Sequence, residues 1–244
     1  MKSIDNKAAN GRVGMFLKRI SSSFELKKLR YYKRNPLEKK GVQFVKDIYK
    51  EEQGGWFSAL CTGRKPVLFS PGELLNIWEQ ARIMCDHGGS FAEVGVFRGA
   101  SAKIISQAKE ETPLYLFDTF EGLPDSVGSS DERFKKGMFF ANQKDVEKRL
   151  AKYPNIYIYA GLFPETAGDI NKKHFSFVHL DVDLYQVTKE ALEFFYPRML
   201  PGGRILSHDY GQCEGVWSAF DEFFKDKQEK LEPMEATQVL VIKK

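Results

Sequence analysis

The sequence predicts an α/β fold built on a mostly parallel sheet. From residue 90 onward, short apolar runs rich in β-branched and aromatic residues alternate with stretches of helical periodicity. These runs are continuously apolar, which is typical of strands that helices cover on both faces. Because crossovers between parallel strands are right-handed, the loops that follow the strands should meet at one edge of the sheet.

The expected elements follow in order along the chain. A helix begins at Ser70-Pro71-Gly72-Glu73, with Ser at the N-cap, Pro at the first helical position and Glu three residues on, and it ends before Gly88-Gly89. Residues 231–243 form two short strands, which end the parallel sheet with an antiparallel pair. Strands are expected at 90–95, 114–118, 155–160, 175–181 and 203–207, and helices at 99–109, 143–151, 184–196 and 214–227.

The length of 244 residues suits one α/β domain with an appendage. We divide the chain into a basic N-terminal arm (1–50), a helical cap segment (51–89) and a main domain (90–244). Residues 1–50 carry 14 Lys/Arg against 4 Asp/Glu, whereas the rest carries 23 against 29. The arm could contact an anionic membrane surface weakly, or it could be a solvated arm or a short helix that packs on a partner subunit.

The three cysteines, Cys61, Cys85 and Cys213, lie far apart and have no C-x-x-C spacing. This argues against a disulfide framework and against a zinc site. No apolar stretch reaches the length of a membrane span, and the N-terminus lacks the features of a secretory signal. We therefore expect a cytoplasmic protein with no transmembrane segment.

The first strand ends in Glu93-Val94-Gly95-Val96-Phe97-Arg98-Gly99. Glycine at a strand-to-helix turn allows the backbone to pass close to a ligand, and the helix N-terminus offers free N–H groups. The G-x-G-x-x-G pattern of dinucleotide folds is missing, which counts against a nicotinamide-dependent oxidoreductase. The pattern E-x-G-x-x-x-G instead resembles an S-adenosylmethionine loop, although such a glycine can also be a simple tight turn.

The second strand ends in Asp118, a position suited to hydrogen bonding with ribose hydroxyls or to capping the loop. The fourth strand leads into Asp181 and Asp183, and the fifth into His208 and Asp209. If these tips are adjacent, three carboxylates and one imidazole converge, a ligand set that suits Mg²⁺ or Mn²⁺. Helix N-capping could explain Asp183 or Asp209 singly, but it explains the whole group poorly.

Several longer stretches extend this pattern over about residues 70–244. They are FAEVGVFRGASA (91–102), YLFDTFEGLP (115–124), GLFPET (161–166), FVHLDVDLY (177–185) and FFYPRMLPGG (194–203). Together they resemble the macrocin O-methyltransferase (TylF/MycF-like) family of class I S-adenosylmethionine-dependent methyltransferases. The resemblance implies a Rossmann-like, seven-stranded sheet with helices on both faces and a C-terminal antiparallel pair.

The resemblance also implies residue roles. Asp181 and Asp209 would hold a divalent metal ion, Mg²⁺ or Mn²⁺. The family usually ends strand five with two acids, whereas here the first is His208, so His208 could ligate the metal, leave it, or act as a base. The cofactor S-adenosylmethionine would be bound by Glu93, Gly95, Phe97, Arg98, Ser101, Asp118, Thr119 and Asp181.

The expected reaction is methyl transfer to a hydroxyl of a sugar, a glycosylated natural product or an envelope glycan. We assign Asp183 as the catalytic base, with His208 as the second catalytic candidate. Two alternatives stay open, a catalytically silent binding module and a metal-independent methyltransferase with His208 as base. We expect a small-molecule or glycan acceptor, no nucleic-acid partner, and a homo-oligomer.

Two further segments could contact the acceptor. Residues 119–142 are long for a connection and contain several aromatic residues, which indicates either a lid or a surface loop. Residues 51–69 contain Gly54-Gly55-Trp56-Phe57 and could form an acceptor wall or a packing layer.

Overall fold

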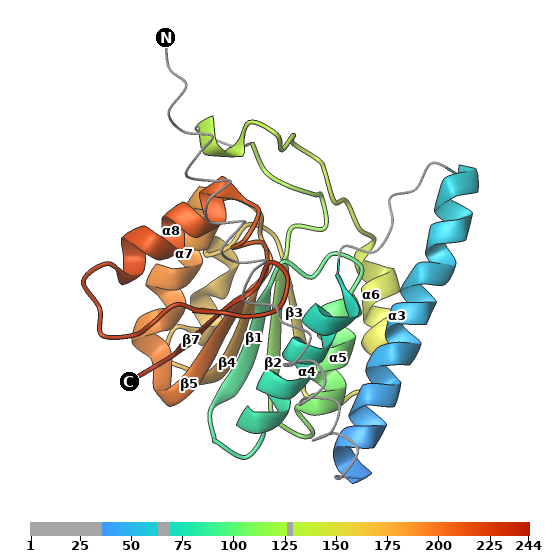
Figure 1. Ribbon diagram of the computed structural model, residues 1–244, viewed down its shortest axis with the longest axis horizontal. Helices are drawn as coiled ribbons and strands as arrows, with labels where there is room; N and C mark the ends of the chain where they lie inside the picture. Colours follow the sequence, from blue (N-terminus) through green and yellow to red (C-terminus); the bar gives the residue numbers. More distant parts are fainter. Residues whose placement is uncertain (1–35, 63–68, 126–128) are drawn as a thin grey trace.

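The computed structural model describes residues 36–62, 69–125 and 129–244, which fold around one sheet (Figure 1). Its neighbouring strands are parallel except that β7 runs antiparallel to both β5 and β6. A mostly parallel sheet with a C-terminal antiparallel pair, as the sequence predicts, is therefore confirmed. The seven strands lie in the order β3 (Ile156–Ala160), β2 (Leu114–Asp118), β1 (Ser90–Val94), β4 (Phe175–Leu180), β5 (Met199–Ser207), β7 (Val239–Ile242) and β6 (Glu232–Pro233).

Helices cover both faces of this sheet (Figure 1). One face carries α4 (Pro71–Met84), α5 (Ala100–Ala108) and α6 (Gln143–Leu150), and α3 (Pro36–Thr62) packs on α4 and α5. The other face carries α7 (Tyr185–Phe195) and α8 (Glu214–Phe224), which pack against each other. Three 3-10 helices complete the described chain, η1 (Ser129–Asp131), η2 (Glu165–Ile170) and η3 (Tyr196–Arg198).

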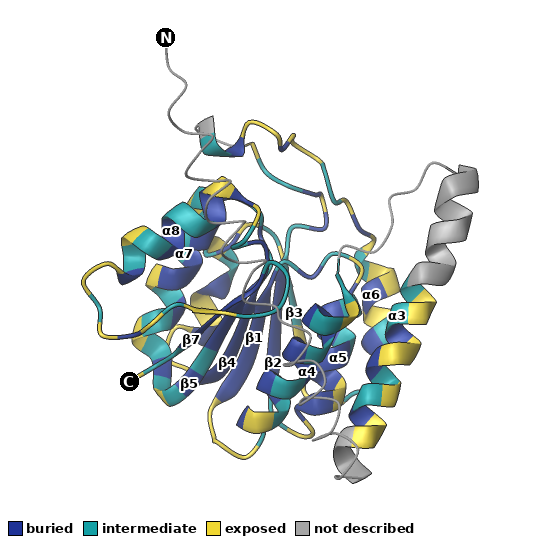
Figure 2. Ribbon diagram, in the orientation of Figure 1, coloured by how far each residue is buried: buried dark blue, intermediate teal, exposed yellow. Residues whose placement is uncertain are grey.

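The strands are buried because their side chains alternate between two apolar clusters. Ala92 of β1 and Phe117 of β2 belong to the cluster under α7 and α8, whereas Phe91 and Leu116 belong to the cluster under α4 and α5. Every residue of β1 and β4 is buried (Figure 2). This burial on both faces explains why the strands read as continuous apolar runs.

The start of α4 has the predicted capping box. Ser70 Oγ accepts a hydrogen bond from the backbone N–H of Glu73 (3.2 Å), and the backbone N–H of Ser70 donates to Glu73 Oε2 (2.7 Å). Further along α4, the buried side chain of Asn76 donates to the side-chain oxygen of Gln238 beside β7 (2.9 Å). The N-terminal half of α4 is therefore joined to the C-terminal strand pair.

Helix α3 continues through residue 50, where the sequence analysis divides the arm from the cap segment. Val45 and Ile48 are buried in the same cluster as Leu74 of α4, so this part of the arm packs on the main core. Residues 1–35 lie outside the described residues. So do residues 63–68 and the side chains of residues 53–62, which make up most of the predicted acceptor wall at 51–69.

No helix among the described residues combines the length and the apolar character that crossing a membrane requires.

Candidate active site

A cavity of about 190 Å³ lies at the carboxyl ends of β1, β2 and β4. Since these strands are parallel, the loops that follow them share one edge of the sheet, as the sequence predicts. Glu93, His208 and Asp209 do not line the cavity and are buried behind it. The predicted site residues that line it are Gly95, Phe97, Arg98, Ser101, Asp118, Thr119, Asp181 and Asp183.

The loop after β1 requires glycine at its first turn. Gly95 has a φ of 84°, a left-handed conformation that glycine adopts without strain. A Cβ atom at this position would lie 1.9 Å from the carbonyl oxygen of Asp181, so only glycine lets the loop approach the tip of β4. The loop then leads into α5, whose second residue, Ser101, is buried against the cavity.

Asp118 braces this same loop. Its Oδ2 accepts hydrogen bonds from the backbone N–H groups of Val96 (2.7 Å) and Phe97 (2.8 Å), and its Oδ1 accepts one from Phe120 (2.7 Å). A carboxylate has about four lone-pair sites, so Asp118 retains capacity for a further donor from the cavity. Of the two roles expected from the sequence, ribose binding and loop capping, these hydrogen bonds show the second.

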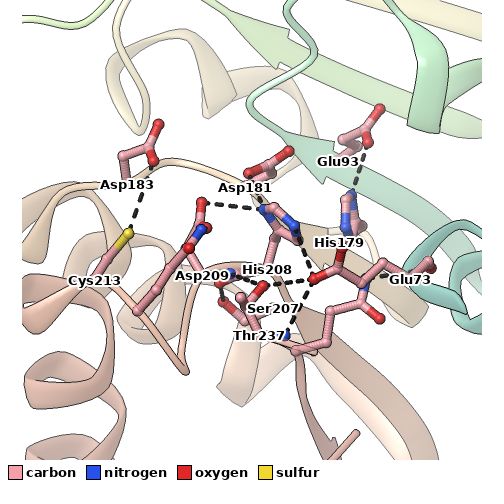
Figure 3. A network of polar contacts seen from close by, with 12 residues as sticks. Glu73, Glu93, His179, Asp181, Asp183, Ser207, His208, Asp209, Cys213 and Thr237 are labelled. Carbon is pink, nitrogen blue, oxygen red and sulfur yellow. Dashed lines mark hydrogen bonds and ion pairs between the residues drawn. The ribbon is translucent and has the colours of Figure 1, made fainter. Parts of the chain in front are cut away.

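Glu93 lies behind the cavity, whereas the other residues predicted to bind the cofactor line it. Its side chain is wholly buried, and Oε1 lies 2.8 Å from Nδ1 of His179, which is also wholly buried (Figure 3). Burial is the main reason that the pKa of Glu93 is raised well above its usual range and that the pKa of His179 falls to about 4. Glu93 therefore supports the loop from beneath, and the structure gives it no direct exposure to the cavity.

The tips of β4 and β5 bring acidic side chains to one buried imidazole ring (Figure 3). Nδ1 of His208 lies 3.1 Å from Asp181 Oδ1 and 3.1 Å from Asp209 Oδ2. On the other side of the ring, Nε2 lies 3.3 Å from Glu73 Oε1. The His208 side chain is 2% exposed, so these three carboxylates determine its electrostatic environment.

The charges in this cluster shift each other's pKa values. Burial alone would lower the pKa of His208, but the carboxylates of Asp209 and Asp181 outweigh burial and raise it well above its usual value. Burial would raise the pKa of Asp209, but the neighbouring His208 reverses this effect and lowers it. The pKa of Glu73 falls to about 2, because His208 again outweighs the effect of burial.

The pKa of Asp183 is shifted in the opposite direction from the pKa values of Glu73 and Asp209. Burial, and then the negative charges of Asp209 and Asp181, raise its pKa well above its usual range. Its backbone has a φ of 61°, as does that of Asp209, and aspartate is one of the few residues that tolerates this left-handed conformation. Left-handed backbone conformations of this kind are common in functional sites.

The residues present fit a divalent cation. One ligand atom each from Asp181, His208 and Asp209 lie within 4.8 Å of one another, and the same holds for Asp183, Asp209 and Cys213. Two carboxylate oxygens with one imidazole nitrogen suit Mn²⁺ better than Mg²⁺. The negative charge that raises the pKa of His208 would also attract a cation.

Two other segments complete the walls of the cavity. Phe139 of the loop at 119–142 contacts Phe97 edge to face, with ring centroids 5.9 Å apart. Backbone hydrogen bonds join the two ends of this loop, from Leu123 N to Met138 O and from Gly137 N to Leu123 O. Glu51 and Glu52 of α3, the first two residues of the segment 51–69 that the sequence offers as an acceptor wall or a packing layer, also line the cavity.

Comparison with known proteins identifies the family. A family model for macrocin-O-methyltransferase (TylF) matches residues 76–242. The chain belongs to this family. The resemblance that the sequence motifs carry is therefore confirmed.

Two curated proteins similar to this chain are named as O-methyltransferases. The first, 8-demethyl-8-(2,3-dimethoxy-alpha-L-rhamnosyl)-tetracenomycin-C 4'-O-methyltransferase of Streptomyces olivaceus, is 27% identical over 139 residues, which is 50% of this chain and 53% of the relative. The second, demethyldecarbamoylnovobiocin O-methyltransferase of Streptomyces niveus, is 23% identical over 152 residues, 55% of this chain and 58% of the relative. The chain thus spans little more than half the length of the curated relatives it matches.

Two solved structures share the fold. The O-methyltransferase NovP has a TM-score of 0.70 at 19% identity, over 83% of this chain and 99% of that one. The calicheamicin methyltransferase CalS11 has a TM-score of 0.60 at 16% identity, over 85% of this chain and 93% of that one. At these identities the likeness establishes the class I methyltransferase fold.

The close approach of Gly95 to β4 can be tested with a matched pair of variants. Gly95→Ala should lower the melting temperature, because the added methyl group displaces the loop from Asp181. It should also weaken the binding of S-adenosylhomocysteine by tenfold or more, about 1.4 kcal/mol. Gly88→Ala is the control, since Gly88 has a similar φ of 83° but no atom near its Cβ position. Calorimetric titration and thermal unfolding measure both effects. Equal affinities in the two variants would show that this contact does not shape the cavity.

Proposed function

We propose that the protein is an S-adenosylmethionine-dependent O-methyltransferase that needs a divalent cation and acts on a hydroxyl group of a sugar. The cavity carries this proposal, because the loop after β1 and the acids after β4 line the same space. One wall offers a glycine turn and a helix N-terminus, and the other offers the carboxylates of Asp181 and Asp183. Between these walls the methyl group of the cofactor and a hydroxyl group with a lowered pKa could come into contact.

The relatives support a sugar hydroxyl as acceptor. One acts, by its name, at the 4' position of a rhamnosyl-tetracenomycin, and CalS11 is described as a TDP-rhamnose 3'-O-methyltransferase. We propose a small-molecule or glycan acceptor of the same kind, a glycosylated natural product or an envelope sugar. A cytoplasmic location and self-association remain predictions from the sequence.

The residues around the loop after β1 have proposed roles in holding the cofactor, which supplies the methyl group. Gly95 and Ser101 would face its methionine part, with Phe97 and Arg98 beside them, and Asp118 its ribose. Thr119 and Asp181 complete the cavity wall. Glu93 would act indirectly, by fixing His179 and the end of β1 from beneath.

Asp181, Asp209 and His208 would hold the divalent cation. When bound, the cation supplies a Lewis acid that lowers the pKa of a nearby hydroxyl. The carboxylates of Asp181 and Asp209 are turned toward the same ring nitrogen of His208, so the three groups are already positioned as a set. Mn²⁺ is the cation that this mixed set favours.

Asp183 would accept the proton from the acceptor hydroxyl. Its side chain lines the cavity, and a raised pKa makes its ionised form a stronger base than an ordinary carboxylate. Phe97 and Phe139 pack together on the cavity wall and would help to exclude water from the proton transfer.

The alternative in which His208 acts as the base receives less support. Its ring does not line the cavity, and both ring nitrogens face carboxylates. A buried imidazole in this position is suited to ligand binding or to charge balance. The silent-module alternative predicts that no cofactor binds, and the following titration tests it.

Calorimetry tests the proposed function directly. S-adenosylhomocysteine should bind the purified full chain with micromolar affinity, and Mn²⁺ should give a separate binding signal that EDTA removes. Asp181→Ala and Asp209→Ala should each abolish the Mn²⁺ signal. If S-adenosylhomocysteine does not bind with or without the cation, the methyltransferase proposal is wrong; if only the Mn²⁺ signal is missing, the metal dependence is wrong.

The role of Asp183 predicts a selective loss of turnover. Asp183→Asn should lower kcat by roughly 10² to 10⁴, the usual contribution of a general base, while the affinities for S-adenosylhomocysteine and Mn²⁺ stay close to those of the wild type. Transfer of a labelled methyl group to TDP-rhamnose is the first assay to try. Normal turnover in the variant with the cation bound would contradict the assignment.

A further inference from the structure

We infer that Glu73, from the first turn of α4, is a positioning residue that orients His208 so that Nδ1 faces Asp181 and Asp209. This inference rests on the proposed function, because the orientation matters to catalysis only if Nδ1 is a ligand for the divalent cation. Glu73 lies outside the strand tips that form the site, and the sequence marks it only as part of a helix cap.

The Glu73 carboxylate is fixed by contacts from separate parts of the chain (Figure 3). Its Oε2 accepts the backbone N–H of Ser70 (2.7 Å). Its Oε1 accepts the hydroxyl (2.7 Å) and the backbone N–H (3.1 Å) of Thr237, in the connection between β6 and β7. The side chain is 4% exposed, so the oxygen that faces His208 Nε2 at 3.3 Å has little freedom to move.

The ring of His208 is held from the same end of α4. Phe69, the residue before the N-cap, lies against it with ring centroids 4.6 Å apart at an angle of 47°. A carboxylate can only accept, and carboxylates face both ring nitrogens. A cation on Nδ1, between Asp181 and Asp209, would leave the ring proton on Nε2, where Glu73 can accept it. Metal-binding histidines commonly donate their second N–H to a carboxylate in this way, which fixes the tautomer and the ring orientation.

The helix cap by itself does not explain a carboxylate at this position. Glutamine at the third helical position completes a capping box as well as glutamate does. A charged group is costly to bury unless a cation or a strong donor compensates it. Glu73 is almost fully buried, and its second oxygen faces both Thr237 and His208, so the carboxylate serves these two neighbours in addition to the cap.

Two substitutions in the full chain separate the cap from the positioning role. Glu73→Gln keeps the capping box through its one oxygen, removes the charge that faces His208, and replaces the oxygen that accepts from Thr237 with an NH₂ group. Ser70→Ala removes the side-chain cap and keeps that charge, so it is the matched control. The readout is Mn²⁺ affinity, measured from the electron paramagnetic resonance signal of free Mn²⁺, together with the melting temperature.

We expect Glu73→Gln to weaken Mn²⁺ binding by roughly 10- to 100-fold, the usual effect of removing a carboxylate behind a ligating histidine. Ser70→Ala should lower the melting temperature without changing the Mn²⁺ affinity. The inference is overturned if Glu73→Gln binds Mn²⁺ as tightly as the wild type does, provided that Asp181→Ala has lost this binding. If the wild type itself binds no Mn²⁺, the metal part of the proposed function fails instead.

A measurement on the wild type keeps the inference testable if Glu73→Gln does not fold. Long-range ¹H–¹⁵N spectra of the chain with Zn²⁺ as a diamagnetic probe report the tautomer of each histidine. The inference predicts that His208 carries its proton on Nε2 and binds the probe through Nδ1. A proton on Nδ1 with Nε2 bare or bound to zinc overturns it.

Discussion

The functional edge of this protein depends on one electrostatic constraint, the placement of three carboxylates around a single buried imidazole ring. Glu73, Asp181 and Asp209 all lie within 3.3 Å of a ring nitrogen of His208. Carboxylates this close repel one another in a buried setting unless positive charge lies between them. The cluster therefore ties α4, β4 and β5 together, and its negative charge is the basis of the proposal that a divalent cation binds at this edge of the sheet.

The histidine at this position also changes the charge balance that the family resemblance implies. Two consecutive acids at the end of β5 would give a site of oxygen ligands alone, which suits Mg²⁺. His208 replaces one negative charge with a ring nitrogen, and Glu73 supplies a carboxylate from α4 behind that ring. The proposed site would thus keep its negative charge, while its ligand set would resemble the nitrogen-containing sites that Mn²⁺ accepts.

The sequence was sufficient for the fold and for the location of the site, because both follow from local patterns. Apolar runs mark strands, and parallel strands bring Gly95, Asp118 and Asp181 to one edge. The contacts of Glu73 were not predictable, because they depend on the docking of α4 beside Thr237, 164 residues away. The pairing of Glu93 with His179 was also not predictable from the sequence, because it depends on the register of β1 against β4.

The most direct test of this account is a crystal structure with S-adenosylhomocysteine and Mn²⁺, with anomalous diffraction recorded at the manganese absorption edge. The account predicts the ligand in the cavity beside Gly95 and an anomalous peak within coordination distance of Asp181, Asp209 and Nδ1 of His208, with Glu73 still against Nε2. A structure that contains the ligand but has no manganese peak at these residues, at saturating Mn²⁺, would contradict it.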